Sequence, residues 1–316
     1  MPAKDQVGLT GPTYEVDIER GKIREFARAM NAPIDDFVTG QVPVIPATFI
    51  VSAPYTWGYT LERPRGTVFA EIDHDLSVPL HAEESIIFHG EPPRAGARLT
   101  AQSSLETVRE KTGRSGGAMT FLTILTQYRD AEGKVMIEQR STTVTTGQSP
   151  GSGSWDTQIP DYKPDYKELD PADPFLQIPR QDWEDLVEGQ GPGSQSTGPL
   201  LLCDIIRFQG VVGEDNPLHH DTVWAKAFDF PTVFGLGTHQ ASVLAAYAAH
   251  WIDPAKVRAM HIRFCGIYWP GDELTYEGSV ISKSISETGE RKVELSLQCK
   301  RNESDVVVQV KMTCVF

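Results

Sequence analysis

Residues 93–110, PRAGARLTAQSSLETVRE, and residues 268–284, YWPGDELTYEGSVISKS, carry the same pattern. In both segments a small or turn residue precedes a glycine, two variable positions follow, and a Leu-Thr pair comes next. The matched positions are Gly96, Leu99 and Thr100 in the first segment and Gly271, Leu274 and Thr275 in the second. Self-similarity of this kind indicates one structural unit that is present twice.

Each segment leads into a predicted antiparallel hairpin. The first hairpin joins residues 118–130, AMTFLTILTQYRD, to residues 135–146, VMIEQRSTTVTT, and the second spans residues 292–316 around an Asn-Glu-Ser turn. A short amphipathic helix is expected earlier in each half, at residues 22–30, KIREFARAM, and at residues 203–212, CDIIRFQGVV. The order of elements is therefore the same in both halves.

A further apolar segment stands between the early helix and the repeated strand of each half. It is ATFIVSAPYTWGY at residues 47–59 and THQASVLAAYAAHWI at residues 238–252, and the second has a clear helical pattern. Each half thus predicts an antiparallel sheet wrapped around one central helix, which is an α+β fold.

A change in composition at about residue 148 separates the two halves. The sequence GQSPGSGSWDTQIPDYKPDYKELDPADP is rich in Gly, Ser, Pro, Asp and Tyr and has neither helical nor strand periodicity. We therefore expect a first module at residues 1–148, a linker at 149–178 and a second module at 179–316. The linker is long enough to cross a surface between modules that lie side by side.

Composition narrows the partners of the chain. Its 316 residues include 43 Asp and Glu against 29 Lys and Arg, a net charge of -14 that would repel the phosphate backbone of nucleic acids. No run approaches the roughly 18 apolar residues of a membrane span, and the first residues lack an apolar signal core. A cytoplasmic protein that binds neither nucleic acid nor membrane is expected.

The cysteines give no sign of a metal centre. All four, Cys203, Cys265, Cys299 and Cys314, lie in the second half within apolar stretches, without a CxxC or Cys/His spacing. We expect buried reduced thiols, no metal and no cofactor.

The segment that carries chemistry is residues 208–251, and its centre is GEDNPLHHD at residues 213–221. Gly213, Asn216, Pro217, Leu218, His219 and Asp221 resemble the Gly-Asp-x-Asn-Pro-Ile-His-x-Asp signature of the MaoC-like (R)-specific enoyl-CoA hydratases. WEDLVEGQ and RFCGIYWPGDELTYEGSV resemble the same family, and GQVPVIPATF and LHAEESIIFHGEPPRAG are similar to the degenerate first module of two-module dehydratases.

This resemblance covers nearly the whole chain except the linker. It implies a double hot-dog fold, in which two antiparallel sheets, each wrapped around a central helix, join into one continuous sheet. It also implies a thioester substrate, acyl-CoA or an acylated carrier protein, and a homodimer is possible.

Hydration of an enoyl thioester needs a base for the water that attacks C3, an acid for C2 and donors for the enolate-like oxygen. By resemblance, His219 is the catalytic histidine and Glu214 stands where the family carries aspartate. The extra methylene of Glu214 changes the reach of the carboxylate, to which catalytic geometry is sensitive. Asp215 offers a second carboxylate, ranked below Glu214, and Asn216 is expected to fix the turn or to orient the water.

Four further residues complete the predicted site. Gly235 matches the glycine that opens the hot-dog helix, where a backbone N–H can stabilise the thioester oxygen, and Phe234 replaces the histidine usually paired with it. Arg263 is either a contact to the phosphates of coenzyme A or a surface strand residue. His239 is either a packing residue or part of the lining of the acyl pocket.

The first module is not expected to be catalytic. When Phe26 of its early helix is aligned with Phe208, Ala32 falls opposite Glu214 and Phe37 opposite His219. The first module is therefore expected to shape the acyl pocket.

Three functions remain open at this stage. The first is a hydratase or dehydratase acting on acyl-CoA. The second is an acyl-carrier-protein dehydratase of fatty-acid or polyketide synthesis, which the net charge of -14 disfavours because such carriers are acidic. The third is a non-catalytic acyl-thioester binder whose site the Glu214 replacement has disabled.

Overall fold

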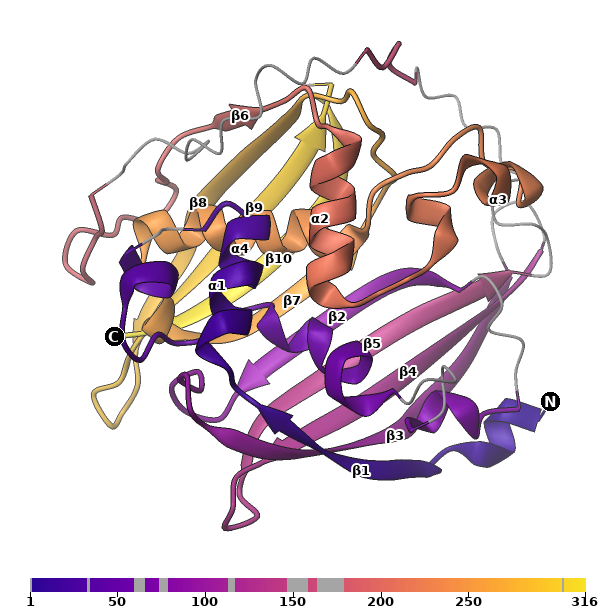
Figure 1. Cartoon of the computed structure of the whole chain (residues 1–316). Helices are drawn as coiled ribbons and strands as arrows, with labels where there is room; N and C mark the ends of the chain where they lie inside the picture. The colour runs from indigo at the N-terminus through magenta and orange to yellow at the C-terminus, as the bar shows by residue number, and fades with distance from the viewer. Residues whose placement is uncertain are drawn as a thin grey trace.

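The structure of the chain is a computed structural model. It describes residues 2–32, 35–59, 66–73, 79–112, 117–146, 159–163, 179–302 and 304–316. Ten strands form one antiparallel sheet in the order β1-β3-β4-β5-β2-β7-β10-β9-β8-β6, and the helices cover one of its faces (Figure 1). The predicted linker, residues 149–178, lies outside the described residues except for residues 159–163.

The sheet consists of two halves joined at their central strands. The first half contributes β1 (Thr10–Asp17), β2 (Leu80–Phe88), β3 (Arg98–Thr112), β4 (Ala118–Arg129) and β5 (Val135–Thr146). The second half contributes β6 (Gln195–Thr197), β7 (Val257–Phe264), β8 (Leu274–Ile285), β9 (Arg291–Arg301) and β10 (Asp305–Val315). Strand β2 pairs with β7, with Ser85 opposite His261, so the predicted continuous sheet is confirmed.

The repeated glycines have the same backbone role in both halves. Gly96 and Gly271 take φ of 93° and 92°, a left-handed conformation that favours glycine, just before β3 and β8 begin. In the second half the following Asp272 accepts a hydrogen bond from the Trp269 N–H at 2.7 Å and pairs with the buried Arg301 at 2.8 Å. The Pro-Gly-Asp element is therefore explained as structural, since it fixes the entry into β8.

The central element differs between the halves. In the second half, α4 (Gly237–Trp251) packs against β8, β9 and β10, and nearly all of its side chains are buried. In the first half, the corresponding segment forms two short helical turns, η3 (Phe49–Ser52) and η4 (Pro54–Gly58). The central helix expected in the first module is therefore present as a short, irregular helical stretch, in which Pro54 is the first residue of η4.

The two early helices meet side by side (Figure 1). They are α1 (Arg20–Ala29) and α2 (Leu202–Val212), and the rings of Phe26 and Phe208 lie edge to face with centroids 5.6 Å apart. Five residues after each phenylalanine, Asn31 and Gly213 both have positive φ, 56° and 82°. The backbone thus follows the same course after both helices, which supports the alignment of Phe26 with Phe208.

Several short elements complete the described fold. They are η1 (Pro2–Gln6), η2 (Asp35–Thr39), η5 (Val68–Ala70), η7 (Pro217–His219), α3 (Thr222–Ala227) and η8 (Pro254–Lys256). No helix within the described residues combines the length and apolar character that a bilayer span needs.

Strand β8 lies near one edge of the sheet and is covered along only part of its length by β6, which has three residues. Further along, the N–H of Gly189 and the carbonyl of Gln190 hydrogen-bond to Val280 of β8. The backbone at Gly191 comes so close that a Cβ there would lie 1.8 Å from the carbonyl oxygen of Gly278. Only glycine allows this segment to lie against the strand.

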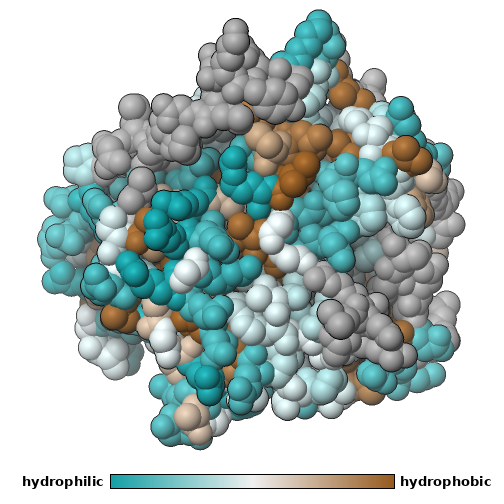
Figure 2. Space-filling view, in the orientation of Figure 1, coloured by the Kyte–Doolittle hydropathy of each residue, from teal (hydrophilic) through white to brown (hydrophobic). Residues whose placement is uncertain are grey.

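The helix-bearing face is mostly hydrophilic, with apolar side chains gathered around the upper end of α2 and beside α3 (Figure 2). Among the described residues there, Ile206 is 46% exposed, Trp224 43% and Val223 80%. These two helices flank the turn that carries Glu214 and His219.

Candidate active site

The turn between α2 and α3 begins at Gly213, whose positive φ ends α2 and redirects the chain. Four residues later, η7 makes a single 3-10 turn over Pro217–His219. Asn216 caps this turn, because its Oδ1 accepts a hydrogen bond from the Leu218 N–H at 3.1 Å. Of the two roles predicted for Asn216, the geometry favours fixing the turn.

Gln209 of α2 is hydrogen-bonded to the turn. The Nε2 of Gln209 donates to the carbonyl of Asn216 at 2.9 Å, and its Oε1 lies 3.0 Å from Nδ1 of His220. Gln209 is 4% exposed. Sequence reasoning missed Gln209, although a polar side chain on the buried face of an amphipathic helix is a signal of such a contact.

His219 is 8% exposed and its imidazole is oriented by one main-chain contact. Its Nδ1 lies 2.8 Å from the carbonyl oxygen of Phe234. Because a carbonyl can only accept, Nδ1 carries the hydrogen and Nε2 of the neutral ring presents a lone pair. The ring of Phe234 packs edge-on against the imidazole, with centroids 5.0 Å apart. Phe234 therefore holds His219 in place.

The carboxylate of Glu214 faces this lone pair. Its Oε1 accepts a hydrogen bond from the Asn216 N–H at 2.9 Å, and its Oε2 lies 3.7 Å from Nε2 of His219. That separation is too long for a direct hydrogen bond, but one oxygen about 2.8 Å from each atom can bond to both. The Glu214 side chain is 15% exposed. The pair is arranged to hold a single water molecule between the carboxyl group of Glu214 and a neutral imidazole.

Burial lowers the pKa of His219 from 6.5 to about 4, because the surroundings disfavour its charged form, and the hydrogen bond to Phe234 offsets part of that effect. At neutral pH the ring is therefore uncharged and able to accept a proton.

The surroundings of the neighbouring carboxylates, Asp215 and Asp221, differ from those of Glu214. Asp215 is exposed, whereas Glu214 points at His219. Asp221 caps α3, since its Oδ1 accepts from the N–H groups of Val223 and Trp224 at 2.8 and 3.1 Å. Glu214 is therefore the carboxylate of the candidate site, and the final Asp of the signature has a structural role.

The structure changes the expected role of Gly235. Helix α4 begins at Gly237, two residues after Gly235, so Gly235 does not open the helix. The N–H of Gly235 donates to the carbonyl of Tyr268 at 3.0 Å. A Cβ at Gly235 would lie 1.9 Å from the Tyr268 ring, so this position requires glycine for close packing. In the first turn of α4 the N–H of His239 donates to the carbonyl of Leu236 at 3.0 Å, so the amides of Gly237 and Thr238 are the ones suited to an oxyanion.

His239 lies in the core. It is 3% exposed, its ring stacks on Phe208 with centroids 4.7 Å apart, and its Nδ1 is 3.4 Å from the hydroxyl of Tyr268. This position favours the packing role over a lining of the acyl pocket.

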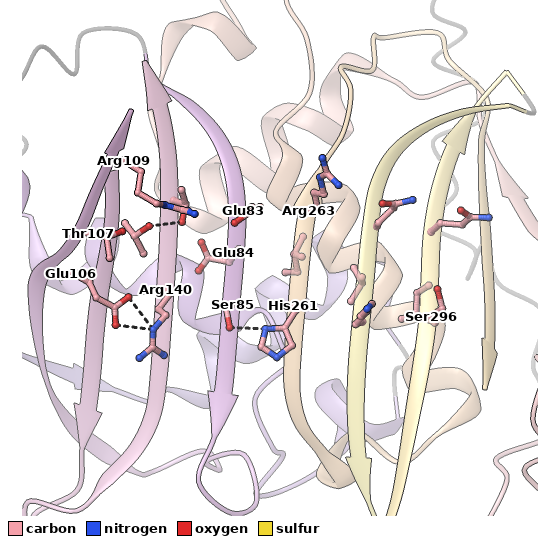
Figure 3. Close-up of a pocket in the computed structure, with 18 residues that line it drawn as sticks. Glu83, Glu84, Ser85, Glu106, Thr107, Arg109, Arg140, His261, Arg263 and Ser296 are labelled. Carbon is pink, nitrogen blue, oxygen red and sulfur yellow. Dashed lines mark hydrogen bonds and ion pairs between the residues drawn. The ribbon is translucent and has the colours of Figure 1, made fainter. Parts of the chain in front are cut away.

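Arg263 is on the wrong side of the sheet for a contact at the turn. Met260 and Ile262 of β7 are buried under the helices, so Arg263 and His261 point to the opposite face. There Arg263 lines a groove of about 750 Å³ that crosses the β2–β7 junction and is walled by Arg109, Arg140 and Lys311 (Figure 3). Of the two roles predicted for Arg263, a phosphate contact or a surface strand residue, this position favours the surface strand residue.

In the described part of the chain, no three His, Cys, Asp or Glu side chains gather as metal ligands. Burial raises the pKa of the Cys314 thiol to about 12 and that of the Cys299 thiol still further, which agrees with unreactive thiols. Cys265, in contrast, is exposed and Cys203 is half-buried, so the expectation that all four cysteines are buried is wrong for these two residues.

Comparisons with known proteins identify both halves. Residues 5–139 match the family model of the FAS1-like dehydratase domain region, and residues 186–302 match that of the MaoC like domain. No curated protein matches the chain.

Solved structures resemble the chain over its full length. One, described as a MaoC-like dehydratase, is 20% identical, with 99% of each chain covered and a TM-score of 0.73. A MaoC-like dehydratase from Phytophthora capsici is 16% identical, with 99% of this chain and 97% of that chain covered and a TM-score of 0.68. A conserved hypothetical protein from Mycobacterium tuberculosis, described as having a double hotdog fold, is 13% identical, covers 98% and 96%, and has a TM-score of 0.58.

At these identities the structural matches establish the fold, which is that of the double hot-dog proteins. The first module is thus a FAS1-like dehydratase region and the second a MaoC-like domain.

Proposed function

We propose that the protein hydrates 2-enoyl-CoA thioesters to 3-hydroxyacyl-CoA, and dehydrates them in reverse, with the (R) stereochemistry of the family that its turn resembles. The observation that carries this proposal is the approach of Glu214 Oε2 to 3.7 Å from Nε2 of a neutral, oriented His219. Two groups of this kind are what a single water needs to be held and deprotonated.

In the proposed reaction, His219 Nε2 removes a proton from the water while the water oxygen bonds to C3. The electrons of the double bond move toward the thioester carbonyl, and C2 receives a proton from the carboxyl group of Glu214. The imidazolium then returns its proton to the carboxylate through the next water molecule that enters the 3.7 Å separation, which restores both groups. Because both residues belong to one turn, hydrogen and hydroxyl reach the same face of the double bond.

The negative charge on the thioester oxygen needs donors as the reaction proceeds. The N–H of Gly235 is used by Tyr268, so we assign this task to the amides of Gly237 and Thr238 in the first turn of α4. The positive end of a helix of 15 residues adds to their effect.

Coenzyme A is the proposed carrier. The chain carries a net charge of -14, which opposes docking of an acidic carrier protein, whereas the phosphates of coenzyme A need only a few local cations. Apolar side chains exposed beside the turn, such as Val223 and Trp224, supply a surface for the uncharged parts of that carrier. We keep the cytoplasmic location and a possible homodimer as parts of this proposal.

The test is the ultraviolet absorbance of the conjugated enoyl group after crotonyl-CoA is added to the full-length protein. A steady loss that requires His219 supports the proposal. An unchanged absorbance, together with tight binding of crotonyl-CoA in calorimetry, would show a binding protein without catalysis. Faster turnover of crotonyl carrier protein than of crotonyl-CoA would show that the carrier is wrong.

A further inference from the structure

A β-bulge in β2 places two polar side chains of the first module on the same face of the sheet. In the pairing with β5, His81 lies opposite Thr143 while Glu83 lies opposite Thr142, so Ala82 is an extra residue. In a regular strand, residues three apart such as His81 and Glu84 would point to opposite faces, because side chains alternate along a strand. Bulges that re-aim a side chain occur often beside active sites.

His81 and Glu84 form a pair in which the glutamate is buried. The Oε2 of Glu84 lies 2.9 Å from Nε2 of His81, and its Oε1 accepts a hydrogen bond from Gln139 at 2.7 Å. Gln139 in turn accepts from the hydroxyl of Tyr128 at 2.6 Å. The Glu84 side chain is completely buried. Apolar residues of similar volume often serve stability as well as such a pair does, so its presence in a core suggests a functional use.

His81 lies between the catalytic turn and the start of α4. Its ring is 4.5 Å from that of Phe264, and Phe264 covers Gly237 so closely that a Cβ there would lie 2.5 Å from the ring. On the other side, Leu80 packs into the cluster that contains Leu218 and Phe234. These two residues precede His219 and hold its Nδ1, respectively. The first module thus places the His81 imidazole against Phe264, which covers the start of α4, and places the adjacent Leu80 against the cluster that supports His219.

One edge of this imidazole is available to a ligand. Both hydrogen bonds that His81 makes with described residues, to Glu84 and to the hydroxyl of Ser141 at 3.1 Å, use Nε2. The side chain is 27% exposed, which leaves Nδ1 accessible. Beside it, the buried hydroxyl of Thr143 has no partner among the described residues. A purely aliphatic acyl chain would leave these polar atoms unsatisfied.

We propose that His81, fixed by Glu84, contacts the acyl group and selects acyl thioesters that carry a hydroxyl group on the chain. This inference rests on the proposed function. A hydroxyl is the chemistry that fits because it can donate or accept, and therefore bonds to Nδ1 in either protonation state of the imidazole. A site that hydrogen-bonds a substrate hydroxyl discriminates against the analogue that lacks it.

The experiment compares hex-2-enoyl-CoA with its 4-hydroxy, 5-hydroxy and 6-hydroxy derivatives. We expect kcat/KM at least about tenfold higher for one of the hydroxylated substrates than for hex-2-enoyl-CoA, a modest ratio because His81 is partly exposed. His81→Gln is the main variant, since its amide can replace Nε2 beside Glu84 but places no polar atom at Nδ1. In this variant the ratio should fall to about one.

His89→Phe is the matched control, because His89 belongs to the end of the same strand, is 44% exposed and lies 3.8 Å from Glu138. It should keep the wild-type ratio. If His81→Gln does not fold, as thermal unfolding would show, His81→Phe replaces it with a ring that can still pack on Phe264.

Two results would overturn the inference: wild-type protein without a preference for any hydroxylated substrate, or an unchanged ratio in the folded His81 variant. Failure of the proposed function would give a different result, namely no hydration of any of the four substrates. In that event the ratio of dissociation constants for hydroxyhexanoyl-CoA and hexanoyl-CoA, measured by calorimetry, decides the role of His81.

Discussion

The segments that follow Phe26 in the first module and Phe208 in the second both contain a residue with positive φ, but they differ in their side chains. Both helices end in a residue with positive φ, Asn31 or Gly213, and a helical turn follows. In the second module Glu214 and His219 then face each other across 3.7 Å. In the first module Ala32 and Phe37 occupy the aligned positions, and both are buried. The aligned positions after the two helices therefore hold buried packing side chains in the first module and the candidate catalytic pair in the second.

The largest expected effect comes from the aligned pair His219 and Phe37. His219→Ala should lower kcat for crotonyl-CoA by about 10²-fold to 10⁴-fold, the range for loss of a general base, with a small change in stability. Phe37→Ala should instead lower the free energy of unfolding by about 3–5 kcal/mol, because it empties a buried site. Steady-state kinetics and urea unfolding of both variants measure these effects. Hydration that survives His219→Ala would break the comparison.

The next test concerns Glu214, whose counterpart Ala32 has no carboxylate. Glu214→Gln should reduce kcat by about 10²-fold, with little change in thermal stability. Asp215→Asn is the control and should be silent, because Asp215 is exposed. The reverse result, in which only Asp215→Asn collapses the rate, would mean that the wrong carboxylate has been assigned.

Glu214→Asp sharpens this test. Oε2 already stands 3.7 Å from His219 and Oε1 bonds to the backbone at Asn216, so the site is built around the longer side chain. Turnover should therefore fall in this variant as well. A rate equal to or above that of the wild type would show that the site still fits the aspartate of related sequences.

A pH effect should follow from the buried histidines of the second module. Burial lowers the pKa of His219 to about 4 and that of His239 to about 3, whereas the unfolded values lie near 6.5. As pH falls from 6.5 toward 4, the unfolded chain binds protons that the native state excludes, so the free energy of unfolding should decrease. Above pH 6.5 this contribution is complete.

Urea midpoints at several pH values measure that dependence. His239→Gln should make the decrease below pH 6.5 shallower. Equal slopes in the wild type and His239→Gln would show that His239 titrates normally in the folded protein.

The smallest effect is expected at Gly213, where both modules have a residue with positive φ. Gly213→Ala should cost about 1–2 kcal/mol, because its φ of 82° is strained for a residue with a Cβ. Gly213→Asn should cost less, since Asn31 adopts φ of 56° at the aligned position and asparagine tolerates this conformation. Thermal unfolding of the two variants gives the order, and a larger loss for Gly213→Asn would argue against equivalent backbones.

Much of this arrangement could be predicted from sequence because it depends on local patterns. The repeated Gly-x-x-Leu-Thr segment, the two hairpins and α2 followed by the Asn-Pro turn are each encoded within a few residues. Glu214 and His219 could be predicted as partners because one short turn carries both. The first module's central segment could not, since an apolar run alone does not distinguish an α-helix from short helical turns.

Other features depend on pairing between distant segments. Arg263 falls on the outer face because of the register of β7, and a one-residue difference would have turned it inward. The extra residue Ala82, which brings His81 and Glu84 together, is defined only by the pairing with β5. The hydrogen bond from Gly235 to Tyr268 likewise joins residues that no local pattern relates.

The segment that lies along β8 has a consequence for behaviour at high concentration. A strand that is left uncovered near the edge of a sheet offers its N–H and C=O groups to a strand of another molecule, which is a route to aggregation. Here the contacts of Gly189 and Gln190 with Val280 occupy part of that edge, and the close approach of Gly191 to Gly278 keeps the segment in place. Any side chain at Gly191 would lift the segment away from β8, so this glycine, far from the chemistry, protects the molecule against self-association.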